Sequence, residues 1–126
     1  PEDFDIILTT NLFGDILSDE AAQVGGGLGM GPAANIGINF GVFEPVHGAA
    51  FNIAGKNIAN PSSILLSTKM MLEWLGDKYN DSDVFNEGKH IEDAIIRLLK
   101  QNSKTKDLGG TLSTTDFTRS VAVSMY

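Results

Sequence analysis

Two carboxylates, Asp15 and Asp19, are spaced so that they could act together. They follow an apolar run and lie where a helical pattern begins. On a helix, side chains four residues apart share one face, with Cβ atoms roughly 5–6 Å apart. Two negative charges at that spacing repel each other, but a divalent cation would reverse the sign, because hard cations such as Mg²⁺ take carboxylate oxygens as ligands. The pair indicates either a metal site or a solvated acidic helix face.

The segments around this pair favour a metal site more than the spacing alone does. Residues 4–10, Phe-Asp-Ile-Ile-Leu-Thr-Thr, have the nearly continuous apolar character of a buried parallel strand. From Leu12 to Val24 the apolar residues follow a helical period, and the glycines at 25–27 end the helix. Ligands of α/β folds bind at the carboxyl ends of strands, and the pair follows such a strand. This position makes a metal site and a solvated acidic face equally favoured interpretations.

A second candidate site is the segment 47–60, which is rich in small residues. Small residues let a backbone come close to a ligand, and consecutive N–H groups can bind an anion. The Gly-x-Gly-x-x-Gly spacing of a Rossmann turn is absent from this segment. His47 could stack on or hydrogen-bond to a base, or be a structural residue. Asn60 precedes Pro61 and is typical of a helix N-cap, although its side chain could also meet a ligand.

The rest of the chain alternates helical patterns with turn signals. Residues 25–41 are dense in glycine but contain apolar residues, which predicts a packed crossover with short extended pieces, and residues 42–46 predict a strand. A helix over 61–75 is apolar almost all round and is expected to end at Gly76. We expect a polar loop over 77–87, an amphipathic helix over 90–101, and a last helix capped by Thr114 or Thr115.

Composition restricts the class of protein. The chain has 126 residues, of which 42% are hydrophobic and 20% charged, which is typical of one globular domain. It has no cysteine, so disulfides and thiolate chemistry are excluded. The net charge of −7 argues against a generic nucleic-acid or anionic-membrane surface, and no apolar run approaches the roughly 20 residues of a membrane span. We therefore expect neither nucleic acid nor a membrane as a partner.

Three long motifs, in order, resemble the β-decarboxylating dehydrogenases, the family of isocitrate, 3-isopropylmalate and homoisocitrate dehydrogenases. They are Asn-Leu-Phe-Gly-Asp-Ile-Leu-Ser-Asp at 11–19, the glycine-rich run that ends at Gly37, and Glu-Pro-Val-His-Gly at 44–48 with its continuation to Pro61. Asp-Leu-Gly-Gly at 107–110 resembles the family's C-terminal segment. The resemblance implies an α/β chain, the C-terminal part of an isopropylmalate/isocitrate dehydrogenase-like fold and not a Rossmann fold. We expect residues 1–27 to end a substrate and dimer-interface domain, and 28–126 to form the C-terminal part of a nucleotide-binding domain.

The resemblance also implies roles for both candidate sites. Asp15 and Asp19 match the aspartates that hold Mg²⁺ or Mn²⁺ with a third from the partner subunit, and Asp15 would meet the substrate through the metal. The segment 48–60 matches the adenosine-binding loop, with His47 and Asn60 near the adenine. The helix 12–24 matches one at the interface of a homodimer or larger oligomer. The implied cofactor-binding residues are His47, Gly48, Ala49, Ala50, Phe51, Asn52, Ile53, Ala54, Gly55, Lys56, Asn57, Ile58, Ala59 and Asn60.

The implied activity is NAD-linked oxidative decarboxylation of a small β-hydroxy acid. The motif at 44–48 looks most like the 3-isopropylmalate branch, which belongs to leucine biosynthesis; the isocitrate and homoisocitrate branches and a non-catalytic regulatory subunit stay open. Asn52 stands where NAD-dependent members usually carry Asp, so NADP also stays open. No catalytic residue can be assigned within this chain, because the family's substrate arginines, catalytic Tyr and Lys and third Asp belong to the preceding region. We expect a piece of a longer, cytoplasmic enzyme, with an organellar location left open, that is inactive alone.

Overall fold

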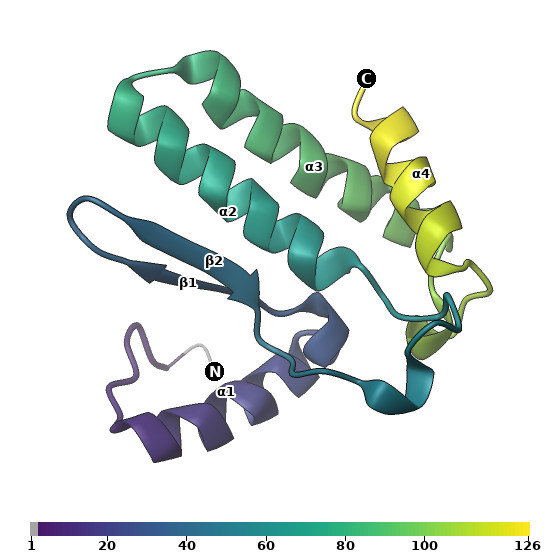
Figure 1. Ribbon diagram of the computed structural model, residues 1–126, viewed down its shortest axis with the longest axis horizontal. Coiled ribbons are helices and arrows are strands. Elements are labelled where there is room, and N and C mark those ends of the chain that lie inside the picture. Colours follow the sequence, from purple (N-terminus) through teal and green to yellow (C-terminus); the bar gives the residue numbers. More distant parts are fainter. Residues whose placement is uncertain (1–2) are drawn as a thin grey trace.

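The computed structural model describes residues 3–126 as four α-helices, three short 3-10 helices and one two-stranded sheet (Figure 1). The first two residues of the expected unit 1–27 lie outside the described residues. None of the helices in residues 3–126 is long and apolar enough to cross a membrane. In chain order the elements are α1 (Asn11–Val24), η1 (Leu28–Met30), β1 (Pro32–Ile36), β2 (Gly41–Pro45), η2 (Phe51–Ile53), α2 (Ser62–Tyr79), α3 (Ser82–Lys100), η3 (Lys106–Leu108) and α4 (Thr114–Ser124).

The sheet is an antiparallel hairpin of β1 and β2. Pro32 pairs with Pro45 at one end and Ile36 with Gly41 at the other, and the N–H of Gly37 donates to the carbonyl of Phe40 across the turn at 2.8 Å. The expected extended pieces and the expected strand near 42–46 are confirmed. Pro45 lies at the last position of β2, where its missing N–H removes no hydrogen bond from the middle of the ladder.

Helix α2 packs against this hairpin through small polar side chains. The hydroxyl of Ser67 donates to the carbonyl of Glu44 at 2.8 Å and to that of Ser63 at 2.9 Å, and the hydroxyl of Ser63 donates to the carbonyl of Gly31. Ser63 and Ser67 are buried, so these bonds satisfy polar groups that would otherwise be costly inside the protein. The expectation of an almost wholly apolar buried helix is therefore wrong on this face, where serines allow close contact.

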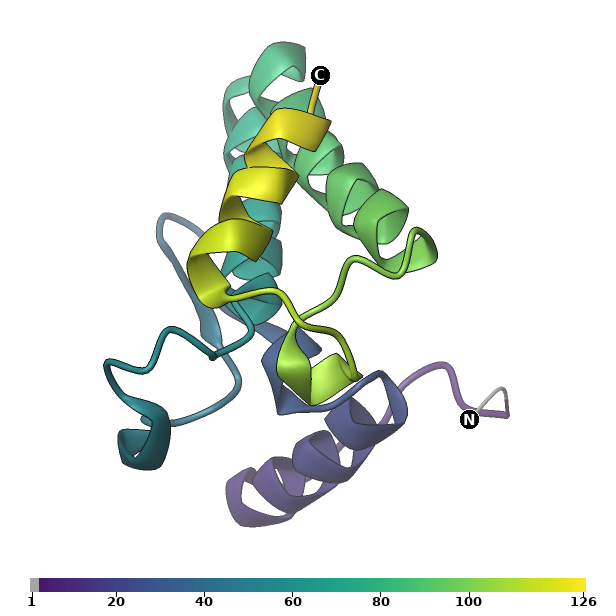
Figure 2. The same ribbon diagram turned by 90° about the vertical axis from the view of Figure 1, so that its right-hand side faces the viewer.

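The hydrophobic core lies on the other side of α2, between α2, α3 and α4 (Figure 2). Its fully buried members are Ile91, Ala94, Ile95 and Leu98 of α3 and Phe117 and Val121 of α4. Partly buried leucines of α2 pack against them. The predicted amphipathic helix is confirmed in α3, because its buried apolar residues recur at helical spacing. In α4, Phe117 and Val121 are buried, whereas Val123 is exposed. The cap of α4 is Ser113, one residue before the two threonines considered.

Two predicted boundaries are wrong at the turn from α2 to α3. Helix α2 continues through Gly76 to Tyr79, and Asn80 ends it in the left-handed conformation at φ 53°. Helix α3 begins at Ser82, inside the expected polar loop, because the carboxylate of Asp81 caps it by accepting from the N–H groups of Asp83 and Val84 at 3.1 Å each. Gly76 is buried where a Cβ would lie 2.7 Å from the backbone nitrogen of Phe85. Gly76 therefore lies within α2 and allows the backbone of α3 to pack closely against it.

The predicted strand at residues 4–10 is also wrong. These residues form no strand and are exposed, Leu8 to 94%. A strand needs a neighbour for its N–H and C=O groups, and within residues 3–126 the sheet consists of β1 and β2 alone. The apolar pattern is that of a strand, but no described segment pairs with it.

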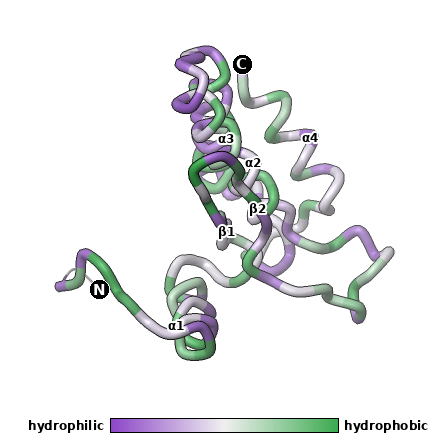
Figure 3. The backbone as a smooth tube through the Cα atoms, turned by 60° about the vertical axis from the view of Figure 1, so that its left-hand side comes forward, coloured by the Kyte–Doolittle hydropathy of each residue, from purple (hydrophilic) through white to green (hydrophobic). Residues whose placement is uncertain are grey.

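Helix α1 lies apart from the other helices and contacts them mainly through η1 (Figure 3). Its predicted range and its end at the glycine triplet are confirmed. None of its residues is buried, and Leu12, Phe13, Ile16, Leu17 and Val24 are exposed. Gly26 and Gly27 have φ values of 117° and 98°, which L side chains rarely adopt. The orientation of α1 relative to η1 thus depends on Gly26 and Gly27.

An ion cluster joins α2 to α3. The Lys69 ammonium lies 3.2 Å from a carboxylate oxygen of Glu73 and 3.1 Å from one of Glu92. Burial lowers the pKa of Lys69, but the hydrogen bonds to the two glutamates outweigh it, so the pKa is raised above its ordinary value of 10.5. The folded state therefore binds this proton more tightly than the unfolded state does. Its contribution to stability is complete below pH 10.5 and is lost as the pH rises through the raised pKa.

We predict that Gly76→Ala destabilises the chain by about 1–3 kcal/mol, because the added methyl group must displace the backbone of α3. The higher helix propensity of alanine, about 1 kcal/mol, does not compensate for this displacement. Urea unfolding followed by circular dichroism measures the change. Gly48→Ala is the control, because a Cβ there meets nothing within 4 Å. Equal stability of the Gly76 variant and the parent chain would contradict the close packing described.

We predict that Lys69→Met lowers the free energy of unfolding at neutral pH by about 0.5–1 kcal/mol. The same variant loses less stability than the parent chain above pH 10.5, because it has no ammonium to deprotonate. Urea unfolding at a series of pH values checks this, with the exposed Lys100→Met as control. The prediction fails if both variants follow the parent's alkaline profile.

Candidate functional site

Asp15 and Asp19 lie on successive turns of α1, as predicted, and both are exposed. The hydroxyl of Ser18 donates to the backbone carbonyl of Asp15 at 3.1 Å. Among residues 3–126, no three His, Cys, Asp or Glu side chains come together to hold a metal ion. The two carboxylates thus offer hard oxygen donors, and the remaining ligands would have to come from water, substrate or another chain.

The segment 47–60 forms an open loop between β2 and α2, with η2 at its tip (Figure 2). One side of the loop borders a hollow of about 650 Å³, lined mainly by the small and apolar residues of 47–59 and by Thr114. The loop also borders a second hollow of about 280 Å³, lined among others by His47, Asn60 and Asp107. The imidazole of His47 makes a 3.1 Å hydrogen bond through Nδ1 to the carbonyl of Gly48. In the neutral ring, Nε2 is then an acceptor.

The structure brings the two predicted sites together at one pocket. A hollow of about 320 Å³ is lined by Asp15 and Ser18 of α1, by Glu44, Pro45 and Val46, and by His47 and Gly48 at the start of the loop. Asp19 is not among the lining residues. Local sequence spacing could not predict that α1 and the loop line the same pocket, because the β1–β2 hairpin separates them in the chain. A ligand that reached both Asp15 and His47 would extend from α1 to the loop.

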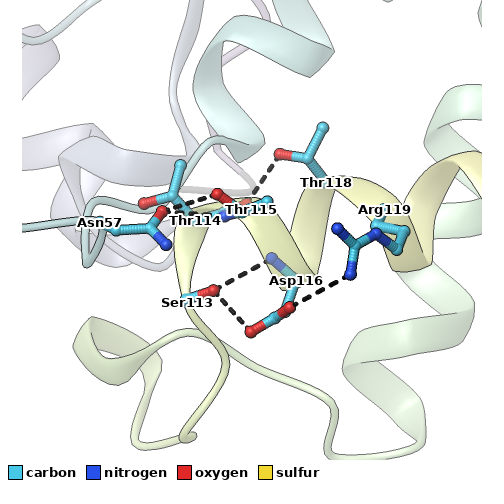
Figure 4. Close-up of polar contacts among 7 residues, drawn as sticks. All are labelled: Asn57, Ser113, Thr114, Thr115, Asp116, Thr118 and Arg119. Carbon is cyan, nitrogen blue, oxygen red and sulfur yellow. Dashed lines mark hydrogen bonds and ion pairs between the residues drawn. The ribbon is translucent and has the colours of Figure 1, made fainter.

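Asn57 fastens the loop to the start of α4 (Figure 4). Its side-chain oxygen accepts from the N–H of Thr115 at 3.1 Å and from the Thr115 hydroxyl at 2.9 Å, and its backbone carbonyl accepts from the N–H of Thr114 at 3.1 Å. The hydroxyl of Thr114 donates to the carbonyl of Ala59 at 2.5 Å. Asn57 has a φ of 55°, a left-handed value that asparagine tolerates better than most residues. We call this set of bonds the Asn57 clasp.

Asn60, the last residue of the loop, makes further hydrogen bonds. Its side-chain oxygen accepts from the N–H of Ser62 at 2.9 Å. The predicted N-cap is nevertheless wrong by one residue, because Pro61 takes the N-cap position and α2 begins at Ser62. The amide nitrogen of Asn60 donates to a carboxylate oxygen of Asp107 at 2.9 Å and lies 3.6 Å from the sulfur of Met30. Asn60 therefore links α2, η1 and η3.

Four polar residues that line these hollows were not predicted as site residues: Ser18, Glu44, Asp107 and Thr114. Asp107 and Thr114 lie at least 47 residues from their partners in the loop, so no local spacing could connect them. Glu44 is in the motif at 44–48, but the motif alone does not show which way its side chain faces. Three of the predicted cofactor-binding residues are exposed on the loop: Phe51, Asn52 and Lys56.

We predict that Thr115→Val loosens the loop, because it removes the hydroxyl that donates to Asn57 and leaves the backbone bond in place. One lost hydrogen bond corresponds to about 0.5–1.5 kcal/mol. Amide hydrogen exchange should speed up at residues 51–57. Thr118→Val is the matched control, because its hydroxyl bonds to the carbonyl of Thr114 within the same helix at 2.8 Å. If both variants change exchange in the loop equally, the clasp has no specific role.

The chain is similar to known proteins along nearly its whole length. The family model of isocitrate/isopropylmalate dehydrogenase matches residues 1–121. The chain is 50% identical, over 97% of its length, to the 3-isopropylmalate dehydrogenase of Archaeoglobus fulgidus and, over 99% of its length, to the isocitrate/homoisocitrate dehydrogenase of Thermus thermophilus. It spans 35% of each of these relatives.

Solved structures match the fold as well. The crystal structure of isocitrate dehydrogenase from Methylococcus capsulatus superposes with a TM-score of 0.88 at 40% identity, over 99% of this chain and 36% of that one. The TT0538 protein from Thermus thermophilus gives the same TM-score and identity over 25% of its chain. The resemblance seen in the three sequence motifs is thereby confirmed. This chain belongs to the isocitrate/isopropylmalate dehydrogenase family and has the mixed helix and strand fold of part of such an enzyme.

Proposed function

We propose that this chain is part of a metal-dependent dehydrogenase that oxidises and decarboxylates a small β-hydroxy acid with NAD. The observation that supports this most directly is the pocket shared by Asp15 and the start of the loop, His47 and Gly48. A dehydrogenase must hold its substrate beside its dinucleotide, and this pocket joins the proposed metal helix to the proposed cofactor loop. The chain spans about a third of its relatives, so the activity is proposed for the whole protein.

Asp15 and Asp19 would hold Mg²⁺ or Mn²⁺. The donor set fits, because both side chains are exposed carboxylates on one helix face and such ions commonly bind through one or two carboxylates with water and substrate oxygens. When bound, the ion would supply Lewis-acid polarisation of the substrate's oxygens. This chain would supply two negative charges on one face of α1, of which Asp15 lines the pocket. Both carboxylates are available to a cation, since neither forms a salt bridge within residues 3–126.

The loop 47–60 would bind the adenosine part of the cofactor. Its small and apolar residues line two hollows, and the clasp and Asn60 fix its C-terminal part. Asn52 is exposed and neutral, so it neither repels a 2′-phosphate nor supplies a cation to attract one. We assign NAD from the neighbouring Ile53, which follows the pattern of NAD-dependent members.

For the substrate we propose 3-isopropylmalate, on the motif Glu-Pro-Val-His-Gly at 44–48. Overall identity does not separate the branches, because a relative named 3-isopropylmalate dehydrogenase and one named isocitrate/homoisocitrate dehydrogenase are each 50% identical. The unusual Asn52 favours one further candidate, a regulatory subunit with reduced cofactor affinity. The two intact aspartates favour the enzyme, because a dead site has no electrostatic reason to retain a repelling pair.

Helix α1 would form a dimer interface. Its five large apolar side chains are exposed, and a helix with an unburied apolar stripe is stabilised when a partner covers it. With this interface we propose that residues 1–27 end the substrate and interface domain and that 28–126 belong to the nucleotide-binding domain. We propose a cytoplasmic location for the enzyme.

The experiment is turnover by the full-length protein that contains this sequence. We expect NADH formation with Mn²⁺ or Mg²⁺ and 3-isopropylmalate, and no turnover by residues 1–126 alone. Asp15→Asn should abolish turnover and Mn²⁺ binding measured by calorimetry, whereas Glu20→Gln on the same helix should preserve both. Activity with isocitrate or homoisocitrate instead would change the branch. A folded full-length protein with no activity on any of the three would overturn the enzyme and favour the regulatory subunit.

A further inference from the structure

A further hollow, of about 380 Å³, lies between the joint that follows α1 and the end of α3. It shares no lining residue with the pocket at Asp15 or with the hollows of the loop. Ligand pockets commonly measure about 300–1,000 Å³, so this one suits a small ligand. We call it the joint hollow, and its lining residues are Gly25, Gly26 and Met30 on one wall and Leu99, Lys100, Lys104 and Leu108 on the other.

Apart from two ammonium groups, the side chains that line the joint hollow are apolar. Met30, Leu99 and Leu108 give an aliphatic surface without an aromatic ring, and the two glycines add no side chain. No carboxylate, amide or hydroxyl side chain lines the hollow, so no side chain there recognises the hydroxyl groups of a sugar. The lining therefore favours a ligand with a short aliphatic body.

The two ammonium groups of the joint hollow have no anionic partner. Within residues 3–126 neither Lys100 nor Lys104 forms a salt bridge, although the whole chain has a net charge of −7. Two like charges beside one hollow repel each other, and an anion between them would replace this repulsion by attraction. The backbone of Lys104 is well anchored, because its carbonyl accepts from the N–H of Leu112 at 2.9 Å and the next residue, Thr105, is completely buried. The ligand that fits has one anionic head.

The reaction proposed above releases an acid of this class. In that reaction 3-isopropylmalate loses a hydride to NAD together with its hydroxyl proton, and one carboxylate is then exchanged for a proton as CO₂ leaves. The product, 4-methyl-2-oxopentanoate, is a branched aliphatic chain with a single carboxylate. We propose that the joint hollow binds this product, with the carboxylate at Lys100 and Lys104 and the branched chain against the apolar side chains. In this choice of acid the inference rests on the proposed function.

The position of the joint hollow gives binding a consequence for α1. Gly26 belongs to the joint that orients α1, and a Cβ there would lie 3.3 Å from Cγ of Met30. On the opposite wall, Leu99 packs against the hydrophobic core. A ligand that touches both walls binds with a different affinity when α1 changes direction, so it stabilises one orientation of α1. Because α1 carries both aspartates, bound product would slow turnover by holding the two proposed sites in one arrangement.

Calorimetry with the full-length protein that contains this sequence tests the binding, in EDTA so that no metal holds the acid at the aspartates. We expect one 4-methyl-2-oxopentanoate per chain, and much weaker binding of 2-oxoglutarate, whose second carboxylate would face the apolar wall. Lys104→Gln and Lys100→Gln should each weaken binding of the product about fivefold, the upper range for a charge pair that water still reaches. Lys89→Gln, an exposed lysine of α3 outside the hollow, is the control.

Steady-state kinetics of the same proteins tests the coupling to α1. The acid should inhibit the parent, and Lys104→Gln should weaken this inhibition about as much as it weakens binding, with kcat and KM unchanged when no acid is added. Inhibition that is competitive with the substrate and equal in parent and variant would be product bound at Asp15, and it would overturn the coupling.

The outcomes separate the inference from the proposed function. If the parent turns over 3-isopropylmalate but binds no acid in EDTA, the inference is overturned and the proposed function stands; the same holds if another segment of the full-length protein fills the hollow. If 2-oxoglutarate binds equally well, or Lys89→Gln has the same effect as Lys104→Gln, the inference is overturned. If a folded parent without dehydrogenase activity binds the acid through the two lysines, the proposed function fails and the binding site stands. Lys100→Gln gives the second reading where Lys104→Gln does not fold.

Discussion

The structure depends on the close approach of α2 to its neighbours on two sides. Towards the hairpin, Ser63 and Ser67 replace bulky side chains and donate hydrogen bonds to carbonyls of Gly31 and Glu44. Towards α3, Gly76 removes the Cβ that would meet the backbone of the next helix. Hydrogen bonds that satisfy buried hydroxyls, and close packing without voids, both contribute only when the distances are short. The central helix is therefore specified by its small residues at least as much as by its apolar ones.

The proposed cofactor loop depends on this same helix for its shape. It leaves β2, which α2 holds through Ser67, and it returns at Asn60, which accepts a hydrogen bond from the first residue of α2. Between these ends the Asn57 clasp attaches it to α4, whose own position is set by the buried Phe117 and Val121. An irregular segment without a regular ladder of its own is thereby fixed at its start by β2 and over residues 57–60 by α4 and α2. The arrangement explains how small, exposed residues can line hollows of defined shape.

The sequence predicted most helices and the hairpin strands, because apolar periodicity and glycine positions report local structure directly. It failed where the outcome depended on a partner far away in the chain. Residues 4–10 have a strand's composition but no described neighbour to pair with, and Gly76 has the appearance of a helix end although it serves a contact with α3. For the site, the motifs suggested Asp15, Asp19 and the loop, but not Asp107, whose link to Asn60 spans 47 residues. Such links follow from the tertiary fold and leave no trace in local spacing.

The glycine triplet after α1 controls how the two proposed sites lie relative to each other. Gly26 and Gly27 hold backbone angles that other residues adopt only with strain, and they set the direction of the helix that carries both aspartates. The separation between Asp15 and the loop is consequently governed by two glycines that line neither the pocket at Asp15 nor the hollows of the loop. A side chain introduced at this joint would misalign two intact sites, and the damage would resemble loss of a ligand-binding residue although every such residue remained.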